Sequence, residues 1–139
     1  MVSEPSSGGK PLVQVSAGII YDTDGAVLAC RRGKGKNPET DFKWEFPGGK
    51  LEPGETARDA VRRELREELG IEVTAGRMIA VIEYEYPTFI IRLHAVECRI
   101  LEGSPHLSVH TGLRWVHPVD LSSLPFCPAD IPLLPLLIQ

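Results

Sequence analysis

The order of hydrophobic and polar residues predicts three strands in the first third of the chain. Residues 12–21, LVQVSAGIIY, alternate at first and are then wholly apolar, which indicates a strand that becomes buried on both faces. The turn sequence DTDG separates it from a second apolar run over 26–32, so the two predict a hairpin. A short third strand over 43–46 ends at PGG, because proline and glycine interrupt strands.

The next periodic segment, residues 57–69, predicts an amphipathic helix. Thr56 is a favourable N-cap, and Gly70 stands where a C-cap glycine is expected. At about 100° per residue, the apolar side chains gather on one face, which is the face a helix buries. That face comprises Ala57, Ala60, Val61, Leu65 and Leu69.

The remainder of the chain predicts a second hairpin, one more strand and two short helices. Their ranges are 77–86 and 89–100 for the hairpin, 112–118 for the strand, and 119–124 and 129–139 for the helices. The order β-β-β-α-β-β-β-α predicts a mixed sheet covered by helices in one α/β domain. We expect this domain to span residues 11–139, after a flexible lead-in over residues 1–10 that is rich in Ser, Gly and Pro.

Three glutamates, Glu64, Glu67 and Glu68, lie on one side of the predicted helix. Glu64 and Glu68 fall inside the apolar arc and Glu67 at its border, whereas Arg62 and Arg66 point the other way and are not placed to neutralise them. A solvated charged helix is disfavoured, because solvated charges belong on the opposite face. Half-buried carboxylates must be paired, protonated or bound to a cation. Oxygen donors without nearby His or Cys favour Mg²⁺ or Mn²⁺, and such an ion favours a polyphosphate substrate.

Composition limits the class of protein. The chain has 139 residues, 42% hydrophobic and 24% charged, with a net charge of −4, which indicates one globular domain with no general affinity for nucleic-acid polymers or membranes. Three separated cysteines without a C-x-x-C pair favour reduced thiols. No segment is typical of a signal peptide or a membrane span. We therefore expect a cytoplasmic monomer or homodimer that acts on a small molecule.

The helix and the loop before it resemble a known motif. Residues 49–71, GKLEPGETARDAVRRELREELGI, are similar to the Nudix box, whose pattern is G-x5-E-x7-R-E-U-x-E-E-x-G-U with U aliphatic. The matching positions are Gly49, Glu55, Arg63, Glu64, Leu65, Glu67, Glu68, Gly70 and Ile71. The flanking segments AGIIYDTDG, CRR, WEFPGGK and FCPADIP resemble the MutT-type branch. The resemblance implies the Nudix fold, an α/β/α sandwich around a mixed sheet, and Mg²⁺-dependent cleavage of a nucleoside diphosphate linked to another group.

The resemblance also implies roles for individual residues. The positions that match metal ligands are Glu64, Glu67, Glu68 and the carbonyl of Gly49. Glu55 and Arg63 match a pair that ties the loop to the helix. Either Glu64 or Glu67 is expected to accept the proton of the attacking water. The choice between these two stays open.

Four residues outside the box are candidates for substrate contacts. Arg32 aligns with a substrate-contacting arginine, and Lys50 is a second candidate for the phosphates. Tyr86 stands where MutT-like proteins place an aromatic residue against the base, although it also fits a half-buried sheet residue. Asp130 aligns with a residue that reads the base edge, although it also fits a helix N-cap. A carboxylate only accepts hydrogen bonds, so it selects the amine of cytosine or the N1–H and 2-amine of guanine and 8-oxoguanine.

The chain departs from the MutT-type pattern in two places. The loop before Trp115 has no carboxylate from His106 onward, where these enzymes often carry a further metal-binding glutamate. We expect His110, which lies nearby, to be a loop histidine rather than a metal ligand. Phe89 stands where 8-oxoguanine enzymes tend to have a basic residue. Asp130 within PADIPLL looks closer to the enzymes that act on CTP and 5-methyl-dCTP.

These features predict a nucleoside triphosphate pyrophosphohydrolase that sanitises the nucleotide pool. The expected products are a nucleoside monophosphate and pyrophosphate, from CTP, 5-methyl-dCTP or 8-oxo-dGTP. The alternative is a catalytically silent Nudix-fold module that binds nucleotides or a partner, which an intact set of box glutamates disfavours.

Overall fold

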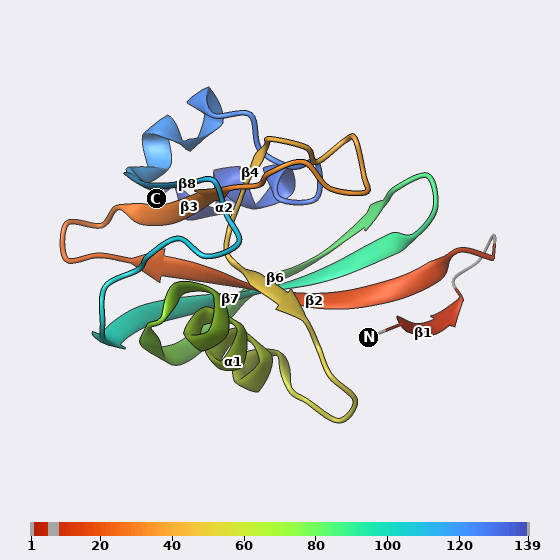
Figure 1. The fold of residues 1–139 in the computed structure, drawn as a ribbon, viewed down its shortest axis with the longest axis horizontal. Helices are drawn as coiled ribbons and strands as arrows, with labels where there is room; N and C mark the ends of the chain where they lie inside the picture. The colour runs from red at the N-terminus through yellow and green to blue at the C-terminus, as the bar shows by residue number, and fades with distance from the viewer. Residues whose placement is uncertain (1, 6–8, 139) are drawn as a thin grey trace.

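The structure, a computed structural model, describes residues 2–5 and 9–138. Within these residues, eight strands join in one sheet, with α1 on one side and the C-terminal helices on the other (Figure 1). The strands are β1 (Val2–Pro5), β2 (Pro11–Tyr21), β3 (Val27–Arg31), β4 (Trp44–Glu45), β5 (Gly48–Lys50), β6 (Glu72–Glu85), β7 (Ile90–Glu102) and β8 (Gly112–Val116). The helices are α1 (Ala57–Leu69), α2 (Leu134–Leu137) and two 3-10 helices, η1 (Pro118–Ser123) and η2 (Ile131–Leu133).

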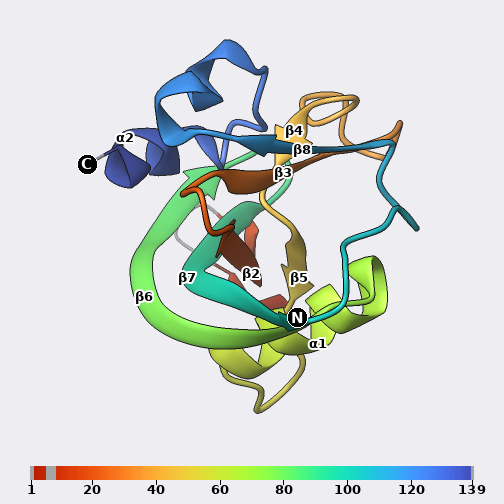
Figure 2. The same ribbon diagram turned by 90° about the vertical axis from the view of Figure 1, so that its left-hand side faces the viewer.

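The sheet is mixed, as the sequence predicts. Its centre is the parallel pair β2 and β7, which runs in register from Leu12 opposite Ile90 to Tyr21 opposite Arg99. The other paired strands are antiparallel, with β6 beside β7, β3 and β5 beside β2, and both β4 and β8 beside β3. Figure 2 shows β6 and β7 curving between α1 and the C-terminal helices. The α/β fold class is therefore confirmed.

Helix α1 has the predicted limits and caps. The Thr56 side chain accepts a hydrogen bond from the amide of Asp59, and Gly70 has a left-handed φ of 69°. Val61 and Leu65 are fully buried against the sheet. A Cβ on Gly18 would lie 3.1 Å from Leu65 and 3.2 Å from Val61, so a glycine in β2 lets the helix approach closely. This close contact fixes the distance between the box glutamates and the sheet.

The C-terminal segment is less helical than predicted. The expected helix over 129–139 is reduced to η2 and the single turn of α2, because Pro132 and Pro135 each lack an amide donor. Leu133 and Leu137 nevertheless pack into the core on the sheet face opposite α1. None of the helices in the described ranges is long and apolar enough to cross a membrane.

Strand β1 lies where no strand was predicted, and β6 begins earlier than predicted. The expected flexible lead-in contains β1, which pairs antiparallel with the start of β2. Among the described strands, β5 joins that edge of β2 only from Val15 onward, so β1 completes the hydrogen bonding before it. Residues 1 and 6–8 lie outside the described residues. Strand β6 begins at Glu72 rather than at residue 77, because irregular pairing around Gly76 interrupts the alternation without ending the strand.

Candidate active site

The three box glutamates have different environments on α1. Glu64 and Glu68 line a cleft of about 620 Å³, whose lining also includes the segment after β3, strand β5, and residues from Tyr86 to Leu93 and from Cys127 to Asp130. The Glu67 side chain is 59% exposed and lies outside the cleft lining. The predicted positions within and at the border of the apolar arc are therefore confirmed.

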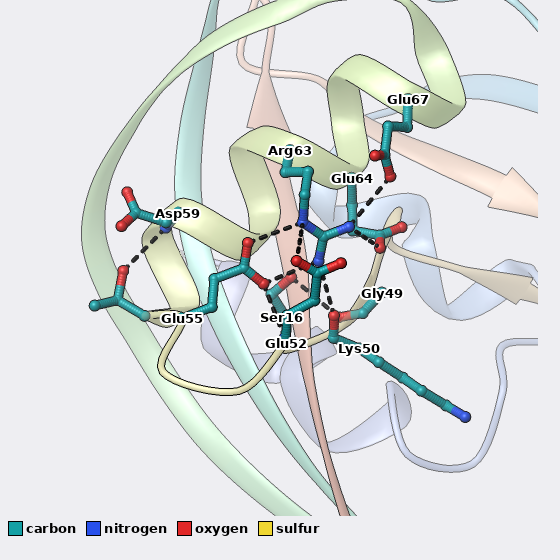
Figure 3. A network of polar contacts seen from close by, with 10 residues as sticks. Ser16, Gly49, Lys50, Glu52, Glu55, Asp59, Arg63, Glu64 and Glu67 are labelled. Carbon is teal, nitrogen blue, oxygen red and sulfur yellow. Dashed lines mark hydrogen bonds and ion pairs between the residues drawn. The ribbon is translucent and has the colours of Figure 1, made fainter. Parts of the chain in front are cut away.

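Arg63 is the centre of the charge network on α1 (Figure 3). Its guanidinium donates two hydrogen bonds to Glu55, of 2.8 and 2.9 Å, and one to the carbonyl of Lys50. It also donates to Glu64 at 2.8 Å and to Glu67 at 3.1 Å. Arg66 pairs with Glu72 instead, in agreement with the expectation that Arg62 and Arg66 point away from the glutamates. The counter-charge to Glu64 and Glu67 comes from Arg63, which the sequence analysis assigned only to the pair with Glu55.

The Glu55–Arg63 pair closes the loop that precedes the helix. Hydrogen bonds from Arg63 hold the pKa of Glu55 at about 2, well below its ordinary value, and Glu55 also accepts from the amide of Glu52. Hydrogen bonds to the carboxylates of Glu55 and Glu64 raise the pKa of Arg63, so its charge is permanent. The pair thereby ties the loop between β5 and α1 to the helix.

Gly49 lets the backbone of β5 approach Glu64. A Cβ at this position would lie 2.4 Å from the Glu64 carboxyl group, closer than any side chain allows. The Gly49 carbonyl accepts a hydrogen bond of 3.3 Å from the Ser16 hydroxyl. A backbone oxygen and a helix carboxylate are thus brought to the same wall of the cleft.

Glu68 is a buried carboxyl group with an unpartnered oxygen, Oε1. Burial raises its pKa to about 7, and His110 opposes this shift while Glu64 and Glu45 add to it. A divalent cation would supply the missing partner and favour the ionised form, so Glu64, Glu68 and the Gly49 carbonyl fit such an ion in their chemistry. Within the described residues, no three acidic, His or Cys side chains converge as a complete ligand set.

The cleft brings together most of the predicted site residues. Those in its lining are Arg32, Gly49, Lys50, Glu64, Glu68, Tyr86 and Asp130. Lys50 is exposed, and Figure 3 shows its side chain extending away from the Arg63 network. Glu55 and Arg63 lie behind the wall, where they contact one another. The cleft has the size of a small-molecule site, and its lining contains both carboxylates and aromatic side chains.

Asp130 and Tyr86 also line this cleft. Asp130 is 4% exposed, and its Oδ2 accepts a hydrogen bond of 3.0 Å from the amide of Phe46. Asp130 occupies the N-cap position of η2, as the second interpretation expected, but its side chain makes no capping hydrogen bond there. Burial raises its pKa well above the ordinary value, with Glu45 adding to the shift. The rings of Tyr86 and Phe89 are stacked, with their centroids 5.0 Å apart. The Tyr86 hydroxyl accepts a hydrogen bond from the amide of Ala129.

Two further residues of the cleft are held together by a contact that the sequence did not reveal. His110 lies in a loop, as expected, but it is buried, and its Nε2 donates a hydrogen bond of 2.9 Å to Glu45. Glu45, which the sequence analysis did not single out, also accepts a bond of 3.2 Å from Arg32. Successive side chains of a strand point to opposite faces, so Glu45 faces away from the side on which Trp44 and Phe46 are buried. This alternation was the signal in the sequence that could have drawn attention to Glu45.

Comparison with known proteins identifies the family. The family description "NUDIX domain" matches residues 11–137. The CTP pyrophosphohydrolase of Escherichia coli is 42% identical over 123 residues, which cover 88% of this chain and 89% of that protein. The 8-oxo-dGTP diphosphatase of Haemophilus influenzae is 34% identical over 125 residues, which cover 90% of each. The solution structure of the E. coli ORF135 protein has a TM-score of 0.77 at 39% identity, covering 94% of this chain and 91% of that one.

The mixed sheet and the acidic cleft define a protein of the α/β class that is built as a hydrolase. The chain belongs to the Nudix family. Its relatives are named as pyrophosphohydrolases and diphosphatases, which favours the enzyme over the catalytically silent module. Nudix hydrolases generally need a divalent metal ion.

Proposed function

We propose that this protein hydrolyses nucleoside triphosphates to nucleoside monophosphates and pyrophosphate, with Mg²⁺ as its metal and Mn²⁺ as a substitute. The observation that carries the proposal is that one cleft has both the carboxylates Glu64 and Glu68 and the residues Asp130 and Tyr86 in its lining. Such a cleft accommodates a polyphosphate and a base together. The match over residues 11–137 supports a single catalytic domain over 11–139.

The box glutamates and the Gly49 carbonyl would hold the metal. When bound, it would neutralise phosphate charge and lower the pKa of the attacking water. Glu64 and Glu68 already line the cleft, whereas the exposed Glu67 would have to turn towards it in order to take part. Arg63 binds Oε1 of Glu64, which leaves Oε2 as the oxygen that would accept the proton of the water. Glu67 is the second candidate for this step.

The substrate contacts follow from the lining of the cleft. Arg32 and Lys50 are the proposed phosphate contacts, since both are cations on its wall. Tyr86 and its stacked neighbour Phe89 offer an aromatic surface to the base, and Asp130 offers its free oxygen to the base edge. A buried acid and the 42% identity with a CTP pyrophosphohydrolase support cytosine bases, including 5-methylcytosine, ahead of 8-oxoguanine.

The surroundings of the cleft support a free nucleotide as substrate. A net charge of −4 disfavours a nucleic-acid polymer, whose phosphates need a basic surface. Cys30, Cys98 and Cys127 are buried free thiols, which supports the reducing cytoplasm. We propose a monomer or homodimer, with no role for a membrane.

The direct test is pyrophosphate release. The protein is incubated with each common dNTP and NTP, with 5-methyl-dCTP and with 8-oxo-dGTP, in Mg²⁺ and then in Mn²⁺. Release of pyrophosphate together with a monophosphate, abolished by a chelator, is expected. Absence of release from every nucleotide, or release of orthophosphate in its place, would overturn the proposal.

A further inference from the structure

Glu45 lies where three segments of the cleft wall meet. It belongs to β4 and is paired with Cys30 of β3, the strand that ends next to Arg32. Its Oε1 accepts a hydrogen bond of 3.2 Å from Arg32 Nη1, and its Oε2 lies 2.9 Å from Nε2 of His110. His110 comes from the segment before β8, which pairs with the other edge of β3. One carboxylate therefore joins a basic side chain from the end of β3 to another from the segment before β8.

The unpartnered polar atoms of the described residues gather at this place. Three buried side-chain atoms make no hydrogen bond: Arg32 Nε, His110 Nδ1 and Glu68 Oε1. All three residues line the cleft, and Glu45 holds the first two through their other nitrogens. A buried polar atom without a partner is costly unless a ligand or water meets it. Their gathering indicates that a polar ligand completes this wall.

Charge alone does not explain Glu45. A polyphosphate is repelled by a carboxylate, and the Glu45 side chain is only 21% exposed, so solvent screens it poorly. Arginine side chains are flexible, however, and fixing one in the correct position before binding reduces the entropy that the ligand must overcome. A carboxylate that holds a guanidinium and an imidazole at once provides this fixation.

We propose that Glu45 is a positioning residue that sets Arg32 and His110 as one basic unit for the phosphate chain. The proposal rests on the function proposed above. Glu45 does not touch the substrate. It acts through the two side chains that it holds, so that the Arg32 guanidinium, with the His110 ring packed behind the same carboxylate, is fixed in position before the phosphates bind.

The test is the effect of Glu45→Gln and Glu45→Asp on steady-state kinetics with the preferred triphosphate. The Gln amide has one acceptor oxygen and cannot hold both basic side chains, Arg32 and His110. The Asp side chain keeps the charge but is too short to reach both of them. Each variant is expected to raise KM about tenfold, the effect of losing one charge-assisted hydrogen bond, with kcat within about twofold. Electrostatic repulsion alone predicts the opposite sign for Glu45→Gln, a lower KM.

Glu83→Gln is the matched control. Glu83 also accepts a hydrogen bond from an arginine, Arg92, but this pair is exposed and both side chains lie outside the lining of the cleft. The KM of the Glu83→Gln variant is therefore expected to stay at the wild-type value. A double-mutant cycle completes the test, because Glu45→Gln should add less than about twofold to KM once Arg32→Ala has removed the side chain that it holds.

The outcomes separate this inference from the proposed function. If the wild type releases no pyrophosphate, the proposed function fails. If the wild type is active but both Glu45 variants keep or lower KM, or if the two effects multiply in the Arg32→Ala background, the positioning role is wrong. Loss of stability with unchanged KM would make Glu45 a structural residue only, which also overturns the inference.

Discussion

At the scale of single residues, Glu68 shows how a site can be built at the expense of stability. Its carboxyl group is buried beside Glu64 and Glu45, so the protonated form is favoured in the folded metal-free protein. An unfolded chain releases that proton near pH 4.5 and the folded one near pH 7. Between these values the folded state binds more protons, and the free energy of unfolding therefore falls as the pH rises.

We expect Glu68→Gln to remove this pH dependence. In the presence of a chelator, the variant should be more stable than the wild type at pH 8, by about 1–2 kcal/mol after allowance for solvent screening, and similar to it at pH 4. Urea denaturation at the two pH values measures the effect. Activity should fall by orders of magnitude. Glu67→Gln should lose activity as well but gain no stability, because Glu67 is largely exposed. Unfolding of both variants would instead make the cluster structural.

Asp130 can present two different hydrogen-bonding patterns to a base. When neutral it has one donor and one acceptor, which match N3 and the amine of cytosine, whereas the ionised form only accepts and matches the two donors of a guanine edge. Burial raises its pKa, so the neutral form persists well above the usual pH range of an aspartic acid. The preference for cytosine over 8-oxoguanine should therefore decrease as the pH rises through the pKa of Asp130.

Asp130→Ala tests this assignment. Leaving a base edge unpaired in a buried pocket costs about 1–3 kcal/mol, so discrimination between CTP and 8-oxo-dGTP should fall roughly 5- to 150-fold. Metal-dependent hydrolysis of poor substrates should survive, and the pH dependence of the preference should vanish. Ratios of kcat/KM for the two nucleotides, measured across pH, decide the matter. An unchanged preference would place base recognition elsewhere in the cleft.

At the scale of elements, predictability followed the strength of local signals. The limits of α1 were predictable because Thr56, Gly70 and the apolar period all indicate the same helix. The C-terminal segment carries conflicting signals, since leucines at helical spacing favour a helix while two prolines prevent one longer than a turn. The start of β6 was not predicted for a related reason. The strand pairs with β7 on both sides of a register shift between Ala75 and Met78, whereas the local hydrophobic pattern indicates a strand only after it.

The loop between β5 and α1 depends on one ion pair, and this gives a prediction at the same scale. Because Arg63 holds the pKa of Glu55 near 2, the pair stabilises the fold at neutral pH, and this contribution is lost as the pH falls from about 4.5 towards 2. Glu55→Gln should lower the free energy of unfolding by about 1 kcal/mol at pH 7 and flatten the acid limb of the stability curve. Denaturant titrations from pH 7 to pH 2 would show it. Activity should fall too, since Arg63 also holds Glu64.

At the scale of the whole molecule, the cleft depends on contacts that no local pattern contains. The box residues were predictable because their spacing is fixed within one loop and one helix. The contact between Glu45 and His110 joins residues 65 positions apart, and it arises from the pairing of both β4 and β8 with β3. Sequence periodicity can assign strands but not their neighbours, so this part of the site required the structure.

The same assembly couples metal binding to the stability of the entire fold. A cation that binds the folded chain and not the unfolded one raises the free energy of unfolding, by about 2.7 kcal/mol at 100 times its dissociation constant. Mg²⁺ should therefore raise the melting temperature of the wild type and of the distant Glu83→Gln variant. It should have little effect on Glu68→Gln, which lacks a proposed ligand and whose metal-free stability is already higher at pH 8. Thermal melts with Mg²⁺ and with a chelator, without nucleotide, make the comparison. An equal shift in all three proteins would mean that the stabilising cation binds away from Glu68.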